Sequence, residues 1–106
     1  MKPRENFYLV MYDITDERTL QKTAKLLQQH GYERINYSVW LGWEGPNDNK
    51  PLFKILREML RDPKAANSKL FILPITKTVL AKIRNLNGRK PTDLDYWLGN
   101  LEILFF

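Results

Sequence analysis

The chain has 106 residues, a formal net charge of +5 and 43% hydrophobic residues, which suits one compact domain with a core and argues against disorder. It has no cysteine and a single histidine, His30, which excludes disulfides and thiolate zinc sites and leaves nothing that resembles a nucleophile elbow. Glycine-rich nucleotide loops, a membrane span and a signal peptide are also absent, so we expect one cytoplasmic domain over residues 1–106 with no membrane association.

The first predicted element is a buried strand over residues 7–12, an unbroken apolar and aromatic run without polar alternation. The strand ends on a carboxylate, Asp13, just before an amphipathic helix. Thr15 or Asp16 can cap the start of this helix, and Gly31 is a natural terminator at its end.

Residues 33–43 alternate strictly, which predicts either one bent strand or two short ones, and the sequence leaves both open. Arg34 and Trp40 fall on the same face of this segment. Arg34 could hold a phosphate there, and Trp40 could stack on a base. Packing of Trp40 in the core or at a dimer interface is the favoured alternative.

The second half of the chain predicts, in order, a helix from Pro51 to Asp62, a strand over 69–74, a short helix over 78–86 and a terminal strand within 100–106. The apolar face of the first of these helices consists of Leu52, Ile55, Leu56, Met59 and Leu60. Because the apolar ending LEILFF must be covered, we expect residues 100–106 to pair with a sheet edge across a dimer.

This order of elements predicts an α+β fold, a ferredoxin-like split βαβ sandwich. The expected antiparallel sheet has two main helices on one face, and a short third helix and a C-terminal strand follow. The sequence shows no internal repeat and no linker that would divide the chain.

The positive charge is concentrated in one segment. Residues 64–92 contain no acid and seven basic residues, which are Lys64, Lys69, Lys77, Lys82, Arg84, Arg89 and Lys90. Such a segment is a candidate contact for nucleic-acid phosphates, and a solvated lysine-rich surface is the alternative.

Carboxylates are the remaining candidates for chemistry. Asp13 and Asp16 flank the first strand-to-helix turn, and oxygen ligands suit Mg²⁺ or Mn²⁺. One acid per subunit is thin coordination, but a symmetric dimer could pair two copies of Asp13 and so support phosphodiester hydrolysis. From these residues alone, a capping role is the favoured interpretation.

Three runs in fixed order, YLVMYDITDE, LLQQHGYER and INYSVWLG, resemble the CRISPR-associated protein 2 family, and the later run KLFILPIT is similar to a strand of that family. The matching positions are Tyr12, Asp13, Leu27, Gly31, Arg34, Ser38, Val39 and Trp40. The resemblance implies a homodimer that binds duplex DNA together with the integrase subunit, CRISPR-associated protein 1, during spacer acquisition.

The resemblance also implies a metal-dependent endonuclease acting on RNA or double-stranded DNA, with Asp13 as the catalytic and metal-binding residue and Mg²⁺ held by the paired Asp13 of a dimer. The candidate supporting or nucleic-acid-binding residues are Tyr12, Asp16, Arg18, Arg34, Trp40, Lys82, Arg84, Arg89 and Lys90. The leading hypothesis is a DNA-binding scaffold, and the second is the endonuclease. A toxin-like Mg²⁺-dependent ribonuclease without an integrase partner is the third.

Overall fold

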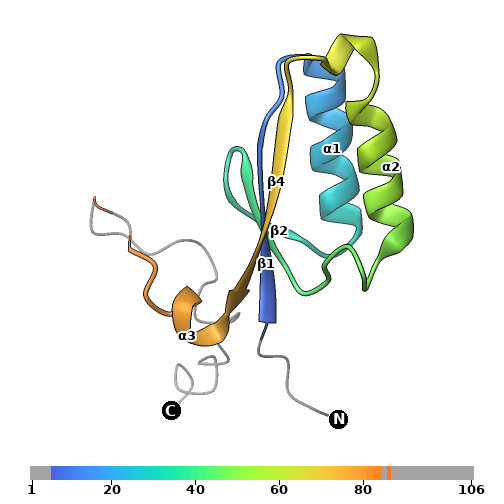
Figure 1. The fold of residues 1–106 in the computed structure, drawn as a ribbon. Coiled ribbons are helices and arrows are strands. Elements are labelled where there is room, and N and C mark those ends of the chain that lie inside the picture. The colour runs from blue at the N-terminus through green and yellow to red at the C-terminus, as the bar shows by residue number, and fades with distance from the viewer. Residues whose placement is uncertain (1–5, 85, 87–106) are drawn as a thin grey trace.

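The computed structural model describes residues 6–84 and 86, which form a four-stranded antiparallel sheet with two helices on one face (Figure 1). In chain order the elements are β1 (Asn6–Asp13), α1 (Glu17–Gln29), β2 (Glu33–Asn36), β3 (Val39–Gly42), α2 (Lys50–Leu60), a 3₁₀ turn (Pro63–Ala65), β4 (Lys69–Thr76) and α3 (Lys77–Leu80). The strand order is β2-β3-β1-β4, with α1 and α2 as the two crossovers. This is the ferredoxin-like arrangement, so the predicted α+β class is confirmed.

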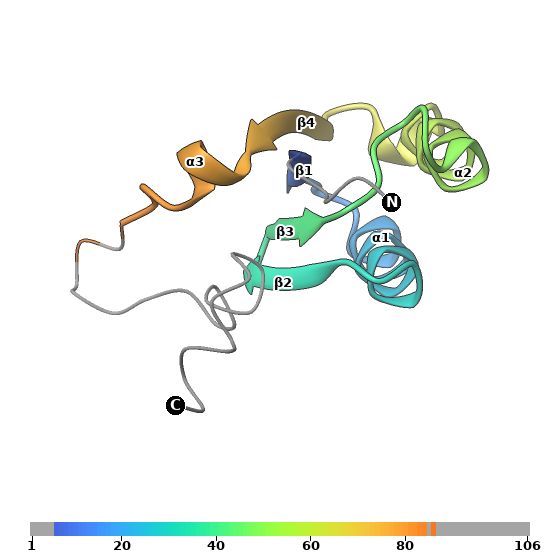
Figure 2. The same cartoon turned by 90° about the horizontal axis from the view of Figure 1, so that it is seen from below.

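Figure 2 shows the four strands in this order, with α1 and α2 together on one side of them. No helix within the described ranges, 6–84 and 86, is both long and apolar enough to cross a membrane. The predicted terminal strand at 100–106 lies outside the described residues, as do Arg89 and Lys90.

The alternating segment 33–43 forms two strands, which answers the question that the sequence left open. The chain reverses at Tyr37 and Ser38, where the Asn36 side chain accepts a hydrogen bond from the Tyr37 amide at 2.6 Å. Asparagine favours such turns because its side chain can bond to neighbouring backbone amides. Arg34 pairs directly with Trp40 across the hairpin, so the two residues share a face as predicted.

Helix α2 begins where the sequence predicts, with Pro51 in its first turn and Asn49 as its N-cap. One residue of its predicted apolar face is wrong, because Ile55 is 42% exposed and Phe53 is buried in its place. The helix is rotated so that Leu52, Phe53 and Leu56 enter the core. Ile55 instead lines a groove between α2 and α1.

Two other boundaries differ from the prediction. Strand β4 continues to Thr76, past Pro74, because β4 is an edge among the described strands and an edge position tolerates a missing amide donor. The third helix has one turn, Lys77–Leu80, rather than residues 78–86. Leu80 is fully buried against Phe7 and Leu41, and Ile83 packs against the same cluster from beyond the helix, whereas Leu86 is fully exposed.

The two faces of the sheet differ in their cover. Val10 and Tyr12 of β1 pack beneath α1 and α2, so the alternating residues Leu9, Met11 and Asp13 lie on the opposite face. One end of that face is covered, because Leu80 of α3 packs there on Phe7 and Leu41, with Leu9 beside them. We call the uncovered apolar part the open sheet face, made of Met11, Val39, Phe71 and Leu73. Phe71 is 60% exposed and Leu73 is 47% exposed, so no described residue covers them.

Candidate functional site at the end of strand β1

Asp13 is an exposed carboxylate at the carboxyl end of β1, a central strand of the sheet. Its direct neighbour across the β1–β4 pairing is Lys69, so both side chains lie on the face away from the helices. Within the described part of the chain, the Asp13 side chain makes no hydrogen bond and no ion pair. It is therefore available to an external group.

Asp16, and not Asp13, caps helix α1. Its carboxylate accepts hydrogen bonds from the Thr19 amide at 2.9 Å and from the Thr19 hydroxyl at 2.6 Å. These bonds, assisted by the nearby charges of Lys64 and Arg18, lower the pKa of Asp16 below its ordinary value of 3.8. Of the two carboxylates at this turn, Asp16 therefore performs the expected capping role and Asp13 does not.

Asp16→Ala should lower the melting temperature by about 5 °C, because alanine leaves the first amides of α1 without an acceptor. The lowered pKa means that the charged form stabilises the fold above about pH 4, and that this contribution is lost as the pH falls through the folded-state pKa. The deficit of Asp16→Ala in thermal melts should therefore shrink below about pH 4. A deficit of the same size at every pH would contradict the capping role of the charged carboxylate.

Basic side chains surround this end of the sheet. Arg18 lies in the first turn of α1, Lys64 lies in the 3₁₀ turn and Lys69 begins β4, and all three are exposed. Lys69 pairs with Asp13, and the charges of Lys64 and Arg18 reach Asp16, so the three form a positive rim around the β1–α1 turn that is suited to the phosphate groups of a nucleic acid. Lys64 and Lys69 belong to the basic segment of the sequence, but the position of Lys69 beside Asp13 follows only from the pairing of β1 with β4.

The residues of one chain fit Mg²⁺ only in part. No cluster of three histidine, cysteine, aspartate or glutamate side chains occurs among residues 6–84 and 86, and Asp16 is engaged with Thr19. Among the described residues at the end of β1, one protomer thus offers the unengaged carboxylate of Asp13. Mg²⁺ commonly binds through one or two carboxylates and completes its shell with waters and substrate phosphates, so two copies of Asp13 would suit it.

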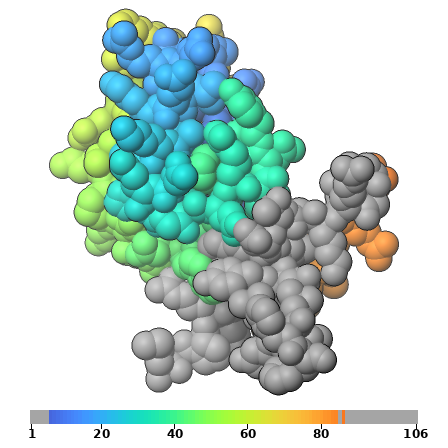
Figure 3. Space-filling model, turned by 180° about the vertical axis from the view of Figure 1, so that it is seen from behind, coloured from blue at the N-terminus to red at the C-terminus, as the bar shows by residue number. Residues whose placement is uncertain are grey.

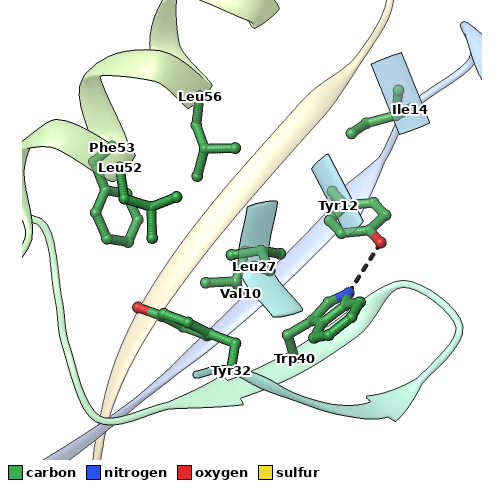
Figure 4. Packing of buried hydrophobic residues seen from close by; sticks show 9 residues of the cluster. All are labelled: Val10, Tyr12, Ile14, Leu27, Tyr32, Trp40, Leu52, Phe53 and Leu56. Carbon is green, nitrogen blue, oxygen red and sulfur yellow. Dashed lines mark hydrogen bonds between the residues drawn. The ribbon is translucent and has the colours of Figure 1, made fainter. Parts of the chain in front are cut away.

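Tyr12 and Trp40 lie in the core rather than beside Asp13. Both rings are at most 5% exposed, and the Trp40 Nε1–H donates to the Tyr12 hydroxyl at 3.0 Å (Figure 4). The favoured interpretation of Trp40 as a packing residue is confirmed, since a buried ring has no face available to a base. Tyr12 supports the site only indirectly, by anchoring the strand that ends at Asp13.

Arg34 lies at the outer edge of the hairpin, on the helical side of the sheet. Its guanidinium lies 4.7 Å from the Trp40 ring centre and 5.3 Å from that of Tyr37. These contacts hold the cation in a groove of about 320 Å³ between α1 and the β2–β3 hairpin, which lie side by side in Figure 3. Arg34 can bind an anion there, but on the sheet face opposite to that of Asp13.

The described part of the basic segment 64–92 does not form one surface. Lys64 and Lys69 lie at the Asp13 end of β4, while Lys82 and Arg84 follow α3 beyond the other end. The 8 residues of β4 separate these ends by roughly 24 Å at the usual rise of a strand. Any contact between phosphates and Lys82 or Arg84 is therefore separate from the site at Asp13.

Comparisons of the sequence with a family model and with known proteins indicate the same protein family. The model of the family described as CRISPR associated protein Cas2 matches residues 6–83. A CRISPR-associated endoribonuclease Cas2 of Archaeoglobus fulgidus is 35% identical over 68 residues, which are 64% of this chain and 69% of that protein. One from Pyrobaculum aerophilum is 32% identical over 84 residues, which are 79% of this chain and 82% of that protein.

Solved structures share the fold. A hypothetical protein from Thermus thermophilus has a TM-score of 0.62 at 28% identity, with 82% of this chain and 98% of that one covered. The Cas2 of Streptococcus pyogenes has a TM-score of 0.59 at 21% identity and covers 74% of this chain and 96% of its own. A chain of a partial Cas6-RT-Cas1–Cas2 complex has a TM-score of 0.65 at 19% identity, with coverages of 82% and 96%.

Proposed function

This chain belongs to the CRISPR-associated protein Cas2 family, and on that premise we propose that it is a cytoplasmic, nucleic-acid-binding homodimer whose paired Asp13 residues cleave phosphodiester bonds. The observation that carries the proposal is the free carboxylate of Asp13. Capping is performed by Asp16, so the acid at the end of β1 has no structural task among the described residues. The relatives named endoribonucleases support RNA as a substrate.

The open sheet face supports the homodimer. Phe71 and Leu73 expose apolar side chains on the same face as Asp13, next to the partly exposed Leu9 and Met11. Burial of such a patch against a second copy removes apolar surface from water. A twofold axis near the carboxyl end of β1 would bring the two copies of Asp13 together.

The chain's own residues supply binding and orientation in this site. Lys69, Arg18 and Lys64 would hold the phosphates around the scissile bond, while the two Asp13 carboxylates would hold Mg²⁺. The ion, when bound, supplies charge neutralisation and a water of lowered pKa.

The direct test is cleavage of RNA and of duplex DNA by the purified chain, with Mg²⁺ or with EDTA. We expect cleavage that depends on Mg²⁺ and is restored when the ion is added back after chelation, because the protein offers too few ligands to retain it. Cleavage that persists in EDTA would contradict the metal-dependent site. Nucleic-acid binding without any cleavage would leave only the binding function.

A second function, the scaffold for spacer acquisition, is supported by the fold shared with the chain of a Cas1–Cas2 complex. In this role the dimer would bind duplex DNA between copies of a Cas1 integrase subunit and would need no hydrolysis. Co-purification with the integrase subunit tests it. Neither role depends on the other, so both can hold for the same dimer.

A further inference from the structure

Helix α2 presents four cations on one narrow strip of its surface, Lys50, Lys54, Arg57 and Arg61, which we call the basic stripe. Their spacings of four, three and four residues place them within a sector of roughly 60° at 3.6 residues per turn. All four are exposed, and the stripe spans roughly 16 Å along the helix axis. It lies away from Ile55 and Met59, which line the groove toward α1.

Helix stability accounts for only part of the basic stripe, because Arg57 in the last turn and Arg61 at the C-cap lie where the helix dipole favours cations. Neighbours in the stripe are like charges at i+3 and i+4, which repel one another on a helix surface. Lys50 and Lys54 lie near the N-terminal end of α2, where the helix dipole disfavours cations, and no acid occurs in the first turn. Helix stability therefore gives no reason for Lys50 and Lys54, or for the alignment of all four cations on one strip.

The four cations are also free of partners within the described chain. Glu58 is four residues after Lys54, yet no ion pair within 4.0 Å and no side-chain hydrogen bond involves any cation of the stripe. The stripe forms one wall of an open groove of about 740 Å³, together with Pro46, Asn47 and Phe53, and among the described residues Glu58 is the one acid that lines it against four cations. A concave surface lined by unpaired cations fits an extended anionic polymer.

We propose that the basic stripe is a second nucleic-acid contact, which binds the phosphate backbone of a duplex on the helical side of the protein. The inference rests on the proposed nucleic-acid-binding function and adds a surface that is distinct from the Asp13 site. The two lie on opposite faces of the sheet, since α2 covers the face away from Asp13 (Figure 1). The stripe contacts phosphates, so it contributes affinity without sequence preference.

The test is the salt dependence of binding to a blunt duplex DNA of mixed sequence. The variant Lys54→Gln with Arg57→Gln should reduce the slope of log affinity against log salt by about 1.8, or about 0.9 for each lost phosphate contact. A matched control is Lys22→Gln with Lys25→Gln, which removes the same charge at the same spacing from α1, across the groove lined by Ile55 and Met59 from the stripe. Its slope should remain close to that of the unmodified protein.

Thermal melts show whether a change in DNA binding by the stripe variant comes from the lost charges or from a loss of folding. Glutamine is a good helix former and relieves the like-charge repulsion, which offsets the loss of Arg57 from the last turn, so the stripe variant should melt close to the temperature of the unmodified protein. Equal slopes for both variants, or a larger loss in the α1 variant, would overturn the inference. Normal DNA binding by the stripe variant with loss of the integrase subunit would instead identify a protein-docking surface. Absence of duplex binding by the unmodified chain would refute the proposed function itself.

Discussion

Asp13→Asn is expected to abolish Mg²⁺-dependent cleavage, with a loss of at least about a hundredfold in rate. The amide lacks the negative charge that a hard cation prefers, and in a symmetric dimer a single substitution removes both ligands at once. The fold should survive, because Asp13 is exposed and makes no side-chain hydrogen bond among the described residues. Rates with and without Mg²⁺, measured on RNA and on duplex DNA, provide the readout.

Asp16→Asn is the matched control for this experiment. It also removes one carboxylate from the same turn, yet its amide oxygen can still accept from the Thr19 amide as a cap. We expect it to cleave at nearly the unmodified rate. If Asp13→Asn retained full activity and Asp16→Asn lost it, the catalytic carboxylate would be Asp16.

Nucleic-acid and integrase binding separate the two functions. Asp13→Asn should bind both nearly as the unmodified protein does, since the positive rim and the basic stripe are unchanged. Loss of folding in this variant, seen by circular dichroism, would mean that the carboxylate of Asp13 is structural. That result would remove the argument for a site at the end of β1.

Phe71→Glu with Leu73→Glu should convert the dimer into a monomer. The two substitutions place four carboxylates in the proposed interface, where each would lose its hydration and repel the others. We expect the dimer dissociation constant to rise by at least about a hundredfold, the effect of losing central interface residues. Sedimentation velocity measures this directly, and a soluble monomer for the unmodified chain would refute the dimer.

The control for the dimer is Ile55→Glu. Ile55 is 42% exposed and Leu73 is 47% exposed, but Ile55 lies on α2, away from the open sheet face. This variant should remain dimeric. The monomeric variant should also lose Mg²⁺-dependent cleavage, because the paired Asp13 site would no longer form; a fully active monomer would show that one copy of Asp13 suffices.

Local signals in the sequence predict several of the helix and strand boundaries of this protein and the face that two of its residues share. The apolar run before Asp13 predicts β1, Gly31 predicts the end of α1, and its φ of +82° shows the left-handed geometry that glycine tolerates. Strict alternation placed Arg34 and Trp40 on one face. Each signal depends on near neighbours in the chain, which is why the sequence alone was enough.

Only the tertiary structure decided which faces are covered and which charges meet. Alternation shows that Tyr12 and Asp13 lie on opposite faces of β1, but the packing of α1 and α2 determines that Tyr12 is buried and Asp13 exposed. The pairing of β1 with β4 brings Lys69 beside Asp13 across 56 positions of sequence and carries Lys82 to the far end of the sheet. Such contacts depend on strand register over long separations, which hydrophobic burial in the assembled fold determines and local sequence patterns do not.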